Sequence, residues 1–386
     1  MFKQLLFYIL ISHCLLSFAT PYRPSSDAEI LQHLPSVNTV YDQELRYWQR
    51  QLNTDTGNLT VAVKAANLLI DKVKIDGDPR YYGYAQAAVK SWWQQAEPPV
   101  DVLLLKAAIK QHNHDFQGAL TDLQTVLNQR PDNAQAWLSQ AVIQTVIGNY
   151  DAAMQSCQRL KRLSTALIYA SCMANTVGLQ GKAESAFLLL QETEANASQE
   201  QDHLWALTLL AELATRLGKN NDAERYFKQA LALPEADVYA LSAYCDFLLD
   251  TGKPKQVVEL IKDNYRSDAL LLRLTLAEQT LGSTAAAQHL DELKLRMAAY
   301  RLRQETLHQR EEARVYLELF KQPEQALKLA LANWQVQKEP WDARLVLAAA
   351  VAAHDITALN SIVTWLKQAQ LQDVQINALV TAAMQL

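Results

Sequence analysis

Two imidazoles and a carboxylate lie close together in the segment His112-Asn113-His114-Asp115. Side chains of these types bind zinc where three or four of them converge on one point. Residues two positions apart on a helix face different directions, and this segment falls in a turn between two predicted helices. We therefore interpret it as a solvated turn, and we expect neither a metal ion nor a cofactor.

The sequence lacks the short motifs that carry common enzyme chemistry. It has no His-Glu-x-x-His zinc motif, no Gly-x-Ser-x-Gly nucleophile turn and no phosphate-binding glycine loop. Without a convergent nucleophile, base or metal set, we do not expect an enzyme.

A second polar cluster lies on a predicted helix between His308 and Arg314. His308 and Glu312 are four residues apart and Glu311 and Arg314 are three apart, so each pair can interact on one helix face. Arg310 and Arg314 share a face and need an acid from elsewhere between them. Two interpretations stay open: a salt-bridge network within the fold, and a polar recognition patch formed by His308, Arg310, Glu311 and Arg314.

Small residues repeat along the chain at intervals of about 34 residues, which is the period of helix–turn–helix repeat arrays. The first set occupies Ala107, Ala141, Ala174, Ala211, Cys245 and Thr275. Seven residues after each comes a turn residue: His114, Gly148, Gly181, Gly218, Gly252 and Gly282. Twelve residues after each comes a second small or β-branched residue: Ala119, Ala153, Ala186, Ala223, Val257 and Ala287. Two helices cross closely where both carry small side chains, so the pattern predicts an all-α solenoid.

The best-matching unit opens with Trp137 and Ala141 and continues with Gly148-x-Tyr150 and Ala153. With its neighbours, it resembles the tetratricopeptide repeat (TPR). The stretches 77–85, 308–314, 332–335 and 339–344 are further similar to a subfamily of exported bacterial TPR proteins for which no activity is known. This resemblance implies a right-handed α-solenoid of TPR-like units with divergent terminal units, and it leaves the function open.

In a TPR array the first helix of each unit lines a concave groove, so the resemblance also suggests which side chains face a ligand. Unit by unit, these candidate groove contacts are Leu104, Gln111, His112, Leu138, Val142, Asn175, Trp205, Thr208, Glu212, Arg216, Tyr239 and Asp246. The first units are apolar and the middle units polar. The Lys, Arg and Asn set with which TPR chaperone adaptors hold an acidic C-terminus is missing. For Trp205 and Tyr239, core packing and groove contact both stay open.

Residues 1–19 have the features of a signal peptide. Lys3 precedes the apolar run from Leu5 to Leu16, and Ser17-Phe18-Ala19 offers small residues for cleavage. We therefore expect a periplasmic or otherwise extracytoplasmic protein whose mature chain does not span the membrane; an uncleaved anchor is the alternative. The remaining sequence divides into N-terminal helices packing on the solenoid (20–99), regular repeats (100–300), and divergent repeats with a capping helix (301–386).

Three cysteines follow the signal segment. Cys157 lies on the second helix of one unit and Cys172 on the first helix of the next, about two turns on either side of the connection near Ser164. An exported protein meets conditions that permit disulfides, so we predict a Cys157–Cys172 bond, with two unbonded thiols as the alternative. Cys245 occupies a small-residue crossing position and should be buried.

The net charge of −5 at pH 7, without a basic cluster, makes the chain a poor candidate for binding nucleic acid. The leading hypothesis is a binding module whose groove holds an extended or helical segment of another exported or envelope protein. The alternative is a structural subunit of a cell-envelope assembly that docks through its outer surface.

Overall fold

The computed structural model describes residue 26 and residues 39–197, 202–234, 236–303 and 308–384. The signal segment 1–19 lies outside these ranges. The chain divides into two compact units, 1–47 and 48–386, and helix α1 (Val40–Thr54) crosses the boundary between them. All further description concerns the second unit.

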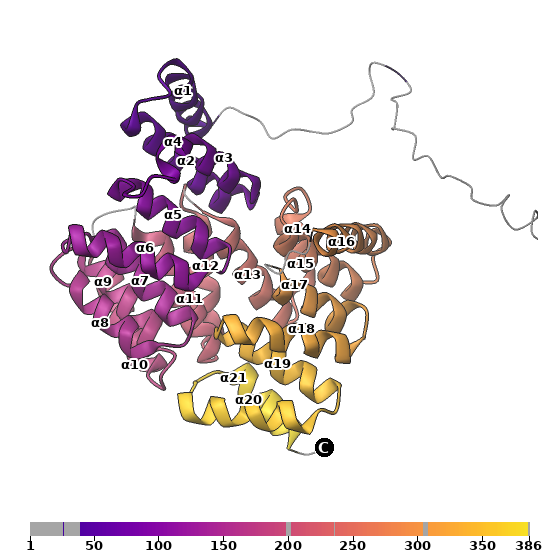
Figure 1. Cartoon of the computed structure of the whole chain (residues 1–386). Helices are drawn as coiled ribbons and strands as arrows, with labels where there is room; N and C mark the ends of the chain where they lie inside the picture. Colours follow the sequence, from indigo (N-terminus) through magenta and orange to yellow (C-terminus); the bar gives the residue numbers. More distant parts are fainter. Residues whose placement is uncertain (1–25, 27–38, 198–201, 235, 304–307, 385–386) are drawn as a thin grey trace, which may run out of the picture. The chain divides into compact units, whose positions relative to one another are not determined.

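Among the described residues of this unit, every regular element is helical (Figure 1). Three helices come first: α2 (Leu59–Asp76), α3 (Arg80–Ala88) and α4 (Lys90–Trp93). Antiparallel pairs follow: α5 (Val100–His112) with α6 (Phe116–Gln129), α7 (Ala134–Val146) with α8 (Tyr150–Leu160), α9 (Ala166–Val177) with α10 (Ala183–Ala195), α11 (His203–Arg216) with α12 (Asn220–Leu231), and α13 (Val238–Asp250) with α14 (Pro254–Ile261). The last part contains α15 (Asp268–Thr280), α16 (Ala285–Leu302), α17 (Gln309–Arg314), the π-helical segment η2 (Val315–Leu319), α18 (Pro323–Val336), α19 (Pro340–Ala352), α20 (Ile356–Ala369) and α21 (Val374–Ala383).

The small residues that repeat along the sequence lie at the contacts within the helix pairs. Ala141 and Ala153 of the second pair are 1% and 0% exposed, and Ala211 and Ala223 of the fourth are both 0% exposed. Closely crossing helices leave no room for larger side chains there. Ala287 departs from the pattern because it is exposed on α16, where the repeat has decayed.

The turn residues confirm the repeat at the level of the backbone. Gly148, Gly181 and Gly218 have φ between +72° and +82°, a region that glycine adopts without steric cost. In the first unit His114 takes the same place with φ +58°. The chain therefore folds as the predicted all-α solenoid of TPR-like units.

The region boundaries proposed from the sequence stay a prediction. Helices α2, α3 and α4 pack against α5. The proposed division at residue 300 falls inside α16. No described helix is both long enough and apolar enough to cross a membrane.

The C-terminal helices return to the first half of the solenoid. The backbone N–H of Lys338 donates to the carbonyl oxygen of Val146 at 2.7 Å, and the N–H of Ala183 donates to Oε1 of Gln372 at 2.7 Å. In Figure 1 the magenta helices α5–α10 stack down one side, and the yellow helices α20 and α21 lie across the foot. The concave side of the early units therefore faces later parts of the same chain.

The structure joins Cys157 and Cys172 by a disulfide, in agreement with the predicted pairing. The two residues lie on the consecutive antiparallel helices α8 and α9, with Cα atoms 5.6 Å apart. Both side chains are buried, and Trp205 packs against the same cluster. Cys245 is a buried free thiol, as expected from its crossing position.

Candidate functional site

Three of the candidate groove residues lie together on α11 and α13. Glu212 and Arg216 are one turn apart on α11, so they share a helix face. Tyr239 lies in the first turn of α13, where Asp237 caps the helix by accepting from the N–H of Ala240 at 2.8 Å. The Tyr239 hydroxyl donates to Oε1 of Glu212 at 2.6 Å. This bond fixes the tyrosine while its side chain stays 56% exposed.

Arg310, on α17, forms a second group of hydrogen bonds in this region. Its guanidinium donates from Nε to Oδ1 of Asp342 at 2.6 Å, from Nη2 to Oε1 of Gln337 at 2.9 Å, and from Nη2 to Glu339. Glu339 and Asp342 also form a reciprocal capping box at the start of α19. Burial by itself lowers the pKa of Arg310, but the carboxylates of Asp342 and Glu339 outweigh it and hold that pKa well above its usual range.

We call the region between α11, α13, α17 and α19 the central recess, and its inner polar cluster comprises Glu212, Arg216, Tyr239, Arg310 and Glu339. Burial raises the pKa of Glu212 to about 7; the charge of Glu339 adds to this rise, and the Tyr239 hydrogen bond, Arg216 and Arg310 oppose it. Tyr239 is open to solvent, yet surrounding protein raises the pKa of its hydroxyl well above the usual value. Tyr239 is therefore accessible, yet its hydroxyl is poorly screened by bulk water.

Arg216 forms a hydrogen bond with the backbone of the neighbouring unit. It is 8% exposed, and its Nη1 donates at 3.1 Å to the carbonyl oxygen of Gly178, the C-cap residue of α9. A cation at a helix C-terminus stabilises the carbonyl groups that lack helical partners. Burial lowers the pKa of Arg216. It is thus mainly a buried helix-capping residue beside the recess.

Two arginines of the C-terminal helices bind the aspartates of α13. Nη1 of Arg314 donates to Oδ1 of Asp246 at 2.9 Å, and Arg344 donates twice to the carboxylate of Asp250, at 2.6 Å each. Both guanidiniums lie over the ring of Trp341, with Cζ 4.4 Å from the ring centroid for Arg314 and 4.3 Å for Arg344. We call these five residues the arginine–tryptophan clasp. It attaches α17 and α19 to α13 through charge, hydrogen bonds and cation–π contact.

Two of the candidate groove residues, Asp246 and Thr208, are buried. Asp246 is 4% exposed and bonded to Arg314 and Arg273, so it is not open to a ligand as a groove residue would be. Thr208 is also buried, at 4%, and its hydroxyl donates to the carbonyl oxygen of Leu204 at 2.7 Å. In both cases the concave face of α11 or α13 is covered by neighbouring helices.

The other candidate groove residues are not gathered into one site. Trp205 packs against the disulfide cluster, which favours core packing over groove contact. His112 stacks on Tyr82, with ring centroids 4.0 Å apart. The remaining candidates are partly exposed along the first helices of three units: Leu104, Gln111, Leu138, Val142 and Asn175.

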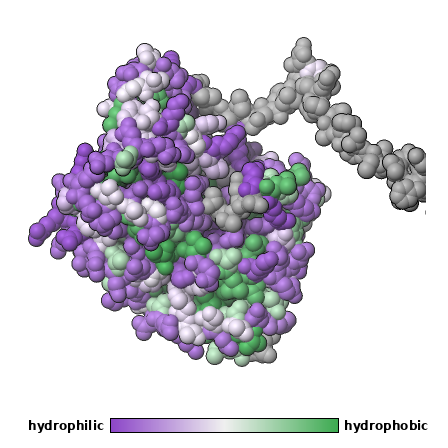
Figure 2. All heavy atoms as spheres, in the orientation of Figure 1, coloured by the Kyte–Doolittle hydropathy of each residue, from purple (hydrophilic) through white to green (hydrophobic). Residues whose placement is uncertain are grey.

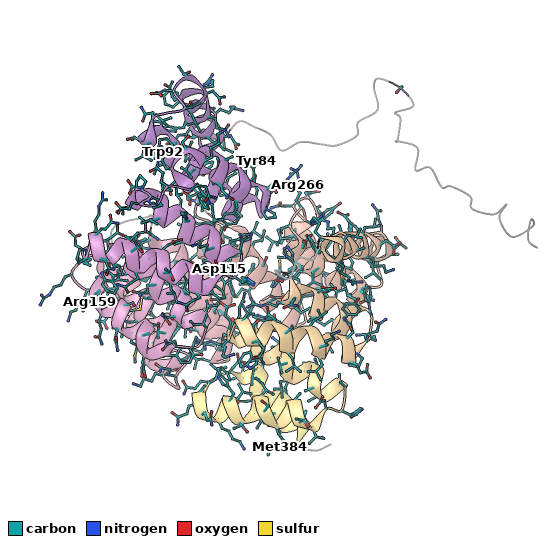
Figure 3. The ribbon with its side chains drawn as sticks, in the orientation of Figure 1. Tyr84, Trp92, Asp115, Arg159, Arg266 and Met384 are labelled. Atoms are coloured by element: carbon teal, nitrogen blue, oxygen red, sulfur yellow. A yellow bond between two sulfur atoms is a disulfide. The ribbon has the colours of Figure 1, made fainter. Side chains whose placement is uncertain are left out.

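The His112–Asp115 turn differs from the solvated turn that we expected. His112 and His114 are half-buried, and Nε2 of Gln337 lies 2.7 Å from Nε2 of His114, because the α18–α19 connection covers this turn. Burial, followed by the charges of His114 and His308, lowers the pKa of His112 to about 4. Asp115 caps α6 by accepting from the N–H of Gly118 at 3.0 Å, and it lies near the middle of the face in Figure 3. Among the described residues, no group of three or more His, Cys, Asp or Glu side chains is arranged to hold a metal ion.

The His308–Arg314 cluster forms a salt-bridge network, but with other partners than those predicted. Glu312 pairs with Arg301 at 2.9 Å rather than with His308, whose ring stacks on Tyr300 at 4.3 Å. Arg314 pairs with Asp246 and Glu318 rather than with Glu311. Each arginine is thus paired with an acid from a distant helix, Arg310 with Asp342 and Arg314 with Asp246, which the helix spacing alone does not reveal.

Sequence reasoning missed the residues at the start of α19. Glu339 and Asp342 bond Arg310, and Trp341 completes the clasp, yet none was named as a site residue. The signal was available, because Glu339-Pro340-x-Asp342 has the spacing of a capping box with proline at the first helical position. Tyr150, predicted only as a repeat residue, lies where the charges of Arg216 and Glu339 act on its hydroxyl.

Figure 2 shows hydrophobic side chains gathered on the viewed face where α11 meets α18 and α19. Hydrophilic residues surround this patch (Figure 2), and Arg159, at the end of α8, points away at the edge (Figure 3). The viewed face thus carries an apolar surface over α11, α18 and α19, and the central recess carries an exposed tyrosine and a carboxylate. Such a surface suits a side chain or peptide segment with both apolar and polar groups.

No protein-family model matches the chain, and no curated protein does. Solved structures are similar at low sequence identity. The Cut9–Hcn1 hetero-tetramer of the APC/C is 16% identical with a TM-score of 0.43, and the match covers 80% of this chain and 52% of that one; this chain thus spans about half its length. The human IFIT1 dimer with m7Gppp-AAAA is 12% identical with a TM-score of 0.46, covering 86% of each chain. A thermophilic TPR protein of Thermus thermophilus is 19% identical with a TM-score of 0.37, covering 53% of this chain and 100% of that one. With TM-scores below 0.5, these similarities carry no argument about the fold or the ligands of this chain.

Proposed function

We propose that this TPR-like repeat protein is a non-enzymatic scaffold that binds an extended or helical segment of another protein in the central recess. The observation that carries the proposal is Tyr239, which is 56% exposed while its hydroxyl is held by Glu212. A tyrosine held in place but uncovered is a favourable interface anchor, because little side-chain freedom is lost on binding. Nucleic acid is a poorer ligand for a chain with a net charge of −5.

A matched pair of variants tests where a partner binds. Tyr239→Ala removes the exposed ring in the recess, and the double variant Leu188→Ala, Leu189→Ala removes two side chains, 53% and 50% exposed, from α10. We expect a partner from a cell-envelope extract to be retained on the wild type and on the α10 variant, and to be lost with Tyr239→Ala. Quantitative pull-down with mass spectrometry measures this.

The reverse result would favour the second candidate function, a structural subunit of an envelope assembly. Leu188 and Leu189 support that candidate because they are exposed side by side on α10, the second helix of its unit. A partner lost from the α10 variant but retained on Tyr239→Ala would refute binding in the recess.

We further propose that the protein is exported and acts in the periplasm or an equivalent compartment, with another exported or envelope protein as partner. The charge and apolar run of residues 1–19 support this. We expect cleavage after Ala19, so N-terminal sequencing of the purified protein should begin at Thr20. A chain that begins at Met1 and sediments with membranes would instead support an uncleaved anchor.

A further inference from the structure

Most charged groups around the central recess already have partners. Arg310 is bonded to Asp342, Glu339 and Gln337. Asp246 and Asp250 are bonded to the arginines of the clasp. These groups fix the fold and leave little capacity for a ligand.

Glu212 is different because its carboxylate is engaged only in part. It accepts the Tyr239 hydroxyl at Oε1, whereas a carboxylate offers about four acceptor positions. Among the described residues, no basic side chain forms an ion pair with Glu212. Arg216, one turn further along α11, donates to the Gly178 carbonyl instead. A carboxylate with spare acceptor capacity therefore lies beside an exposed aromatic ring.

We infer that Glu212 and Tyr239 together bind a lysine or arginine side chain of the partner segment. The carboxylate supplies the opposite charge and hydrogen-bond acceptors, and the tyrosine ring supplies a face for cation–π contact. The net charge of −5 also favours a basic segment. The inference rests on the proposed function, since it specifies the chemistry of the segment that the recess binds.

Proton binding at Glu212 competes with this cation. Burial raises the pKa of Glu212 to about 7, so a large fraction of the carboxyl groups is protonated at neutral pH. The groups facing it are Arg216 on its own helix, Tyr239 on α13, Arg310 on α17 and Glu339 on α19. Because the basic side chain binds the deprotonated form, affinity should rise with pH through this pKa, by at most about tenfold per pH unit.

Selection from a phage-displayed library of short random peptides, with the full chain as bait, tests the inference. We expect the peptides whose binding is lost with Tyr239→Ala to be enriched in lysine and arginine. Glu212→Gln, whose amide oxygen still accepts from Tyr239, should weaken a synthesised histidine-free peptide from this set by about tenfold or more. In this variant the peptide affinity should also no longer increase between about pH 6 and about pH 8. The matched control Glu192→Gln removes the same charge from an exposed position on α10 and should change neither result.

The outcomes separate the inference from the proposed function. Peptides that depend on Tyr239 but are acidic or purely apolar, or basic peptides that bind Glu212→Gln as tightly as the wild type, overturn the inference and leave recess binding intact. If no enriched peptide depends on Tyr239, both the recess as a binding site and the inference fail.

Discussion

Replacement of Asp246 with alanine should destabilise the protein by about 3–5 kcal/mol, because it removes the buried carboxylate that two buried guanidiniums share. Asp246 is 4% exposed and binds both Arg273 and Arg314, which are 7% and 3% exposed. Burial by itself raises the pKa of Asp246, but the two arginines outweigh this and lower it. The stabilisation is therefore present at neutral pH and is lost as the pH falls below about 3.9 towards the lower folded-state value.

Urea denaturation at neutral pH measures this loss as a shift of the midpoint. Asp222→Ala is a matched control, because Asp222 also pairs with an arginine, Arg225, but on the exposed face of α12. That variant should cost no more than about 1 kcal/mol. Equal, small shifts for both variants would show that the Asp246 pairs do not hold the C-terminal helices to α13.

Loss of the Cys157–Cys172 disulfide should lower the free energy of unfolding by about 3 kcal/mol, because the bond closes a short loop and restricts the unfolded chain. The sequence separation is 15 residues, and the bond joins two consecutive helices at a buried contact. Urea denaturation of the oxidised protein with and without a reductant measures the difference. Mass spectrometry of the unreduced protein should find a cross-linked peptide and one free thiol, Cys245.

The double variant Cys157→Ala, Cys172→Ala provides the control for reduction. Its stability should be the same with and without reductant, whereas that of the wild type should fall. A wild type that is insensitive to reductant, or three cysteines that all react with alkylating reagent in the unreduced, denatured protein, would contradict the disulfide.

The features that follow from contacts near in sequence could be predicted from the sequence. Ala141 and Ala153 mark the contact of one helix pair, and Gly148 between them has the positive φ that ends the first helix. The Cys157–Cys172 bond belongs to the same class, because two consecutive antiparallel helices fix the separation of residues on either side of their turn. Each of these depends on a single helical hairpin, whose geometry is set by its own residues.

The composition of the central recess was decided only by the tertiary structure. Asp246 and Arg314 are 68 residues apart in the sequence, Asp250 and Arg344 are 94 apart, and His114 and Gln337 are 223 apart. Glu212 could be assigned to the concave side from the repeat, whereas the repeat left Tyr239 open between core packing and groove contact. The covering of Asp246 and Thr208 could not be recognised. Whether distant units meet depends on the small rotations between successive repeats added over the whole array. A periodic sequence pattern specifies how each unit packs on its neighbour. It does not specify the total rotation over many units, which decides whether distant units come into contact.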